Sequence, residues 1–152
     1  MYQFTRLFQL RRKMMQILML RINPIKFALY GIKLGKQPRI CNHVYLHVHP
    51  KSSVTIGDSF TMTSGENFNP LCRNIQGTIY AEREDTVIKI GNHVGMSSTC
   101  LWAKREIIID DHVNIGGDCI IMDSDAHNLD WHVRDSGEMF DETTTMDVHT
   151  AA

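Results

Sequence analysis

A short run in the C-terminal half of the chain carries residues suited to proton-transfer chemistry. It reads Met122-Asp-Ser-Asp-Ala-His127, so two carboxylates lie close before one imidazole. Because the ordinary pKa of imidazole lies near neutral pH, a positioned histidine takes a proton from a weak nucleophile as that nucleophile attacks. His127 is therefore a candidate general base, but the chain has eight histidines and residue type alone does not select one.

The other histidines fit structural positions better. His43, His47 and His49 cluster without a further type of metal ligand nearby, which favours exposed strand or corner positions over a metal site. His93 and His112 recur at the same place in two repeats, and we expect them to stack at a surface corner. The four cysteines lack Cys-x-x-Cys spacing, so we expect no metal centre and a reducing compartment.

Two adjacent repeats come just before this run. The segment that starts at Ile107 aligns with the segment that starts at Ile88, nineteen residues earlier, and this alignment pairs Cys100 with Cys119. Large apolar residues recur six apart in each repeat, at Ile90, Met96 and Trp102 and then at Ile109, Ile115 and Ile121. Neither a helix nor an alternating strand has this period, whereas a chain that turns a corner every six residues does. The pattern predicts an all-β fold, a hexapeptide-repeat parallel β-helix.

The repeat pattern divides the chain into three parts. Residues 39–126 form the coil, with irregular first turns, and the aliphatic pattern ends near His127. Residues 127–152 then protrude as a C-terminal loop. Residues 1–38 form an N-terminal helix, predicted over Tyr2–Ile22 and ended by Asn23-Pro24, followed by a connector.

The N-terminal part is basic and amphipathic. Ten of the 16 Lys and Arg residues precede residue 58, and the first acidic residue is Asp58. The apolar run over residues 14–20 is too short to span a bilayer, which needs ~20 residues, and no signal-peptidase site follows it. We expect a helix that packs on the coil, with a peripheral membrane-surface helix as the alternative. Nothing in the sequence indicates a nucleic-acid module.

Two segments resemble the hexapeptide-repeat acyltransferases, most closely the maltose and galactoside O-acetyltransferase branch. They are Ile88–Gly95 and Ile115–Cys119, the latter followed by the Asp-Ala-His run, and the resemblance covers residues 54–140. It implies a left-handed β-helix and a homotrimer with sites between subunits. It also implies transfer of an acetyl group from acetyl-CoA to a hydroxyl of a sugar or polysaccharide precursor. The cytoplasm is the expected location, because the cysteines indicate a reducing compartment.

The resemblance also implies roles for single residues. His127 matches the catalytic base, and Glu138 matches the carboxylate that orients it. Asp123, Asp125, Ser98 and Trp131 are candidates for acceptor contacts; the two aspartates fit corners equally well, and Trp131 fits loop packing. Ser98 is expected one coil beneath His127. The family continues with further coils that carry the coenzyme A groove, so the chain is interpreted as C-terminally truncated, with the return to the coil beginning at residues 148–152.

Other functions remain open. A zinc hydratase of the γ-carbonic anhydrase type would use His127 and His132, with His93 or His112 of another subunit as third ligand. A truncated β-helix without catalytic activity would serve as a structural or partner-binding module. Among transferases, the sequence does not separate hydroxyl from amine acceptors.

Overall fold

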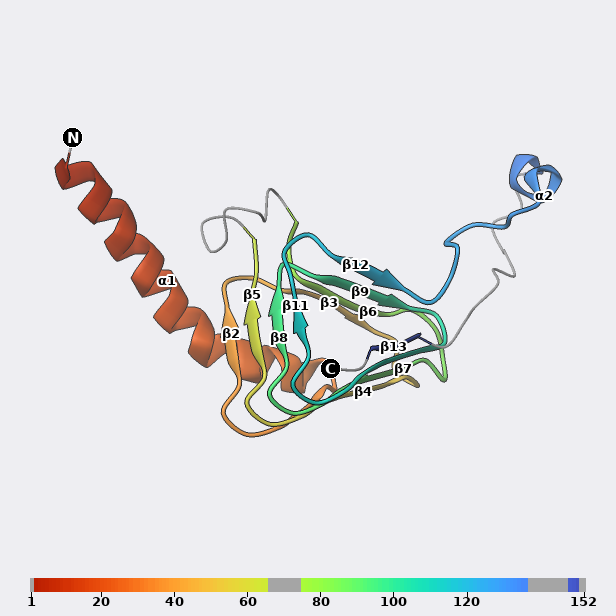
Figure 1. Ribbon diagram of the computed structural model, residues 1–152, viewed down its shortest axis with the longest axis horizontal. Coiled ribbons are helices and arrows are strands. Elements are labelled where there is room, and N and C mark those ends of the chain that lie inside the picture. The colour runs from red at the N-terminus through yellow and green to blue at the C-terminus, as the bar shows by residue number, and fades with distance from the viewer. Residues whose placement is uncertain (1, 66–74, 137–147, 151–152) are drawn as a thin grey trace.

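The chain winds into a left-handed parallel β-helix with three flat faces (Figure 1). The computed structural model describes residues 2–65, 75–136 and 148–150. Each coil adds one strand to each of three parallel sheets, in the orders β1-β4-β7-β10-β13, β2-β5-β8-β11 and β3-β6-β9-β12. The strands are β1 (Lys33–Leu34), β2 (Arg39–Cys41), β3 (Tyr45–Val48), β4 (Ser53–Ile56), β5 (Thr61–Thr63), β6 (Thr78–Ala81), β7 (Val87–Ile90), β8 (Gly95–Ser97), β9 (Cys100–Ala103), β10 (Glu106–Ile109), β11 (Asn114–Ile115), β12 (Ile120–Met122) and β13 (Val148–Thr150).

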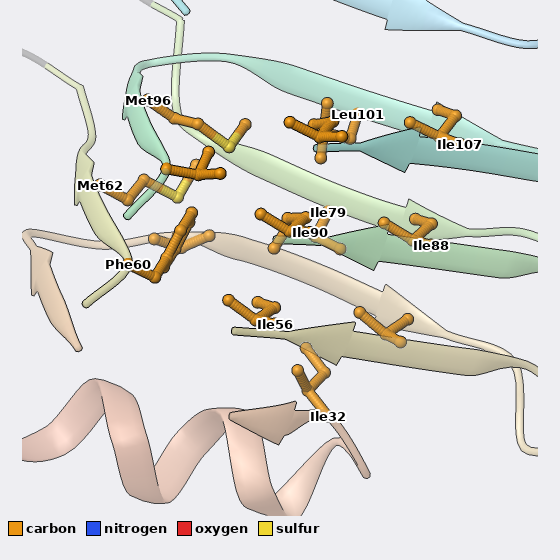
Figure 2. Close-up of a cluster of buried hydrophobic side chains, with 14 of the residues drawn as sticks. Ile32, Ile56, Phe60, Met62, Ile79, Ile88, Ile90, Met96, Leu101 and Ile107 are labelled. Carbon is orange, nitrogen blue, oxygen red and sulfur yellow. The ribbon is translucent and has the colours of Figure 1, made fainter. Parts of the chain in front are cut away.

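Inward-facing aliphatic residues stack into ladders that fill the coil (Figure 2). Ile56 pairs with Ile90, and Ile90 pairs with Ile109 in the next strand of the same sheet. Met62 and Met96 form the equivalent rungs of the second sheet, and Ile79 and Leu101 those of the third. Because neighbouring strands lie ~4.8 Å apart, each side chain contacts its equivalent one coil along. The predicted β-helix is confirmed.

One corner of the coil is fixed by a ladder of Asp and Asn side chains. The backbone N–H of Lys36 donates to Asp58 at 2.7 Å, that of Asp58 to Asn92 at 2.9 Å, and that of Asn92 to Asp111 at 2.6 Å. The residue before this ladder must be small, since a Cβ on Gly57 would lie 2.7 Å from the backbone of the next coil. These contacts explain the Gly-Asx spacing of the repeats.

Helix α1 (Tyr2–Leu29) is longer than the sequence predicts, because Pro24 does not end it. Proline removes one backbone donor, but packing against the first coil holds the last turns in place. The buried amide of Asn23 donates to the carbonyls of Ile40 at 2.8 Å and Asn42 at 2.9 Å. Phe27 is completely buried beneath the first coil. The expected end at Ile22 is therefore wrong, whereas the expected packing of the helix on the coil is observed.

The edges of the coil also differ from the sequence interpretation. β1 already pairs with β4, so the coil begins at Lys33, within the stretch assigned to the connector. At the other end, β13 pairs with β10, and the return of the chain at Val148 is observed. The protruding segment therefore lies between β12 and β13.

The register of the third sheet differs by one residue from the one that the sequence predicts, which changes the partner of Cys100 and the orientation of Trp102. Ile120, not Cys119, is opposite Cys100, because the chain from Ile115 to Ile120 is one residue longer than the paired stretch from Met96 to Cys100. Leu101 faces the core, and Trp102, expected in the ladder, faces outward. Since successive strand residues point to opposite faces, a shift of one residue exchanges the inner and outer positions.

Candidate functional site

The segment Asp123–His127 begins where β12 ends, and the buried carboxylate of its first residue fixes it. Asp123 is completely buried. Its two oxygens accept the backbone N–H groups of Lys104 at 2.8 Å, Arg105 at 2.6 Å and Glu106 at 2.8 Å. Those three residues form the corresponding corner one coil earlier. Of the two roles expected for Asp123, the structure places it in the corner role.

Lys104 ties the next part of the run to the coil. Its side chain is almost completely buried, and its ammonium donates to the carbonyl oxygen of Ala126 at 3.3 Å. The same ammonium lies 4.0 Å from a carboxylate oxygen of Glu82 and 5.9 Å from the ring centre of Trp102. The indole N–H of Trp102 donates to the other Glu82 oxygen at 2.5 Å. Charge and hydrogen bonds thus hold the residue that precedes His127.

Sequence reasoning missed this cluster of Glu82, Trp102 and Lys104. A lysine after a strand is normally exposed, so its residue type gave no signal. The contact between Trp102 and Glu82 was missed because Trp102 was expected to face the core, and an inward-facing Trp102 cannot reach the Glu82 carboxylate. The signal that was present is the spacing: Glu82 and Lys104 each follow, by one residue, the alanine that ends a strand of the third sheet.

His127 is exposed and follows a tight turn. The backbone N–H of His127 donates to the carbonyl of Asp125 at 2.6 Å, and Ala126 between them has φ of 61°. Asp125 is also exposed. An imidazole on a fixed turn at the surface is accessible to a substrate and to a neighbouring molecule. Glu138, the expected orienting carboxylate, lies outside the described residues.

Ser98 is not beneath His127. It lies at the corner between β8 and β9, whereas the His127 run leaves from the far end of β12, so a full strand separates the two corners. Ser98 is completely buried, with φ of 44°, and its hydroxyl accepts the backbone N–H of Gly65 at 2.9 Å. The residue one coil beneath the run is Lys104.

Trp131 begins the short helix α2 (Trp131–Asp135) in the protruding segment. Asp130 caps this helix by accepting the backbone N–H of His132 at 2.9 Å. The Trp131 ring lies 3.5 Å from the His132 ring between centres, yet 62% of Trp131 is exposed. An exposed indole at this position can stack on a ligand or on another subunit.

Aromatic side chains line the outer face of the third sheet, where no functional residue was expected. The His47 and Tyr80 rings stack at 4.3 Å between centres, and Trp102 meets Tyr80 edge-on at 5.8 Å. Burial, followed by the nearby charge of Glu82, raises the pKa of Tyr80, so this phenol stays protonated at neutral pH. The aromatic ladder ends at the cluster that holds the His127 run.

Metal-binding groups do not gather within the described part of this single chain. Among those residues, no three His, Cys, Asp or Glu side chains are placed to hold one ion. His93 and His112 instead stack on each other, with ring centres 4.9 Å apart and planes inclined by 6°.

Comparisons with protein-family models, with curated proteins and with solved structures gave no significant match.

Proposed function

We propose that this chain is an acyltransferase that moves an acetyl group from acetyl-CoA to a hydroxyl of a sugar or polysaccharide precursor, with His127 as general base. One observation carries the proposal: an exposed imidazole follows a turn whose Ala126 carbonyl accepts from buried Lys104, just after buried Asp123 anchors the chain to the previous coil. A general base needs access to its substrate and a fixed position, and the two are combined here.

In the proposed reaction, the acceptor hydroxyl attacks the thioester carbonyl carbon while His127 takes the hydroxyl proton. A C–O bond forms, and the carbonyl oxygen bears the negative charge of the tetrahedral intermediate. Backbone N–H donors at a coil corner would stabilise that oxygen. The C–S bond then breaks, the carbonyl re-forms, and the imidazolium returns the proton to the coenzyme A sulfur. The products are an acetyl ester and the free thiol.

We further propose a homotrimer in which sites lie between subunits, in the cytoplasm where acetyl-CoA is supplied. The segment that carries α2 extends away from its own coil (Figure 1). A partner's coil alongside would place this segment over a second surface and bring donor and acceptor together. Asp125 and Trp131 are then the exposed residues best placed to contact a sugar.

The test has two stages. Acetyl-CoA is first titrated into the purified 152-residue protein by calorimetry, and binding at micromolar strength, about −8 kcal/mol, is expected. Release of coenzyme A thiol is then followed with a panel of mono- and oligosaccharides. The His127→Ala variant should lose about 10²–10⁴-fold in kcat, with acetyl-CoA affinity unchanged.

His132→Ala is the matched control, since His132 is an exposed histidine of the same segment and should be dispensable for transfer. Full activity of His127→Ala would overturn the assignment of the base. A folded protein that binds no acetyl-CoA would overturn the transferase proposal for this polypeptide. Stoichiometric zinc in the same preparation, with CO₂ hydration lost in both variants, would favour the hydratase instead.

A further inference from the structure

The outer face of α1 carries large apolar side chains that are mostly exposed. Leu7, Met14 and Ile25 each leave 63% of their surface exposed, and Leu10 and Ile17 leave more than half exposed. At 100° per residue these five positions fall within one stripe of the helix. The helix therefore has an apolar face that is continuous from Leu7 to Ile17 and resumes at Ile25, after Arg21.

This stripe lies opposite the face that packs on the coil. Met19, Asn23 and Phe27 form the packing face, and all three are buried. The N-terminal part of the helix extends beyond the coil, and only its last turns lie beside the first strands (Figure 1). Packing within the chain thus uses one face of α1 and leaves the other directed outward.

Cations surround the apolar stripe. Arg6 and Lys13 flank it on one side, Arg11 flanks it on the other, and Arg21 lies within it; all four are exposed. The helix contains no acidic residue, and the first in the chain is Asp58. The outer face is therefore both apolar and strongly positive.

The charges on this outer face distinguish between two partners that could cover the apolar stripe, a second copy of α1 and a lipid bilayer. A second copy of α1 laid on the stripe would bring Arg21 and the flanking cations of two helices together, without a carboxylate on either helix to pair with them. A bilayer with anionic headgroups matches both properties, because acyl chains accept the apolar side chains and headgroups attract the cations. Within the described residues, no helix is apolar enough over sufficient length to cross a membrane.

We propose that α1 binds in the plane of an anionic lipid surface, with the stripe of Leu7, Leu10, Met14, Ile17 and Ile25 in the interface. Its packing face then holds the first coil nearest the lipid. The His127 segment leaves three coils farther along, roughly 14 Å away at ~4.8 Å per coil. Such an arrangement keeps that segment in the aqueous phase and near a membrane-bound molecule. This inference does not depend on the proposed acetyl transfer.

Co-sedimentation with vesicles tests the proposal. The full chain should bind vesicles of phosphatidylcholine with about one third phosphatidylglycerol, and should bind pure phosphatidylcholine at least ten-fold more weakly. High salt should weaken binding to the anionic vesicles, because screening removes the long-range attraction but leaves the apolar contact.

Two pairs of variants separate the contributions. Leu10→Gln with Ile17→Gln should reduce binding about ten-fold or more, whereas Leu129→Gln, at a still more exposed leucine in the protruding segment, should not change it. Arg11→Gln should reduce binding about five-fold, whereas Lys89→Gln, an exposed lysine of β7, should change it little. None of these side chains belongs to the core, and circular dichroism confirms that each variant is folded.

Three outcomes would overturn the proposal. Equal binding to neutral and anionic vesicles would remove the charge argument. Unchanged vesicle binding by Leu10→Gln with Ile17→Gln, together with loss of an oligomer in sedimentation velocity, would show that a second copy covers the stripe. Binding that depends on Arg11 but not on the apolar residues would indicate a soluble polyanion as the partner.

Discussion

The two ends of the β-helix are closed differently. At the first coil, Phe27 of α1 is completely buried, and Ile32 lies above the helix at the base of the ladder beneath Ile56 (Figure 2). At the last coil, Ile115 and Ile121 are only half-buried. Among the described residues, only the first sheet continues there, as β13, so β11 and β12 are edge strands.

This difference has a consequence for the candidate site. In a coil architecture each turn is stabilised mainly by its neighbours, so a coil with one complete neighbour is held less firmly than a coil with two. The His127 run leaves from such a coil. Apolar stacking acts there from one side only, and polar contacts add to it: Asp123 accepts three backbone N–H groups, and Lys104 donates to the Ala126 carbonyl.

The largest expected effect comes from removing the closure at the first coil. Phe27→Ala should lower the free energy of unfolding by about 3–5 kcal/mol, because it leaves a cavity where the ring is completely buried. Ile121→Ala at the last coil should cost less than about 2 kcal/mol, since that side chain is already partly exposed before substitution. Urea unfolding with an unchanged m-value measures both. Equal losses would show that the last coil is as well covered as the first, which a neighbouring subunit would explain.

The sequence predicts the regular parts of this fold well. A spacing of six is compatible with a coil and with neither regular helix nor strand, so the ladder through Ile90 and Ile109 was accessible from residue types alone. The packing of the N-terminal helix on the coil was predicted from its apolar spacing, whereas the return of the chain at Val148 was expected only from the family resemblance.

Positions at which the chain departs from the regular repeat were harder to predict from the sequence. Leu101 and Trp102 are both large and apolar, and their types alone do not say which faces inward. The inserted corner residue near Cys119 changes the offset from nineteen to twenty only in the third sheet. Pro24 is a helix-ending signal that tertiary contacts of Asn23 and Phe27 override.

The candidate site was likewise only partly predictable from the sequence. His127 was selected by its place after the last repeat, and that is where the structure has it. Lys104 and Glu82 act through contacts between coils, and such contacts depend on a register that single residues do not reveal. Ser98 was misplaced because the position in the coil was counted without deciding at which corner it lies.

Asp123→Asn tests whether polar groups replace packing at the open end. The amide would direct an N–H₂ group toward backbone donors, and we expect a loss of about 1.5–3 kcal/mol in the free energy of unfolding. Amide hydrogen exchange at Lys104, Arg105 and Glu106 should accelerate. The neighbouring exposed Asp125→Asn should stay within about 0.5 kcal/mol of the natural protein. Unchanged exchange in Asp123→Asn would mean that the corner is held by the strands alone.

The smallest effect concerns Asp111, at the corner ladder of the same last coil. Hydrogen bonds from the Asn92 backbone and then from its side-chain amide hold the pKa of Asp111 below its ordinary value of 3.8, and the nearby His112 and His93 lower it further. A depressed folded-state pKa means that the carboxylate contributes stability above the unfolded-state value. That contribution is lost as the pH falls from 3.8 through the lower folded-state value.

Asp111→Asn keeps an acceptor for the Asn92 N–H but does not titrate. Its difference in urea midpoint from the natural protein should therefore be present at neutral pH and shrink as the pH falls below 3.8. High salt should reduce the difference, because the group is fully exposed. A difference that stays constant across this range would show that the ladder depends on hydrogen-bond geometry and not on charge. The Asp111 corner would then resemble the preceding rung of the ladder, where the uncharged side chain of Asn92 accepts the Asp58 N–H.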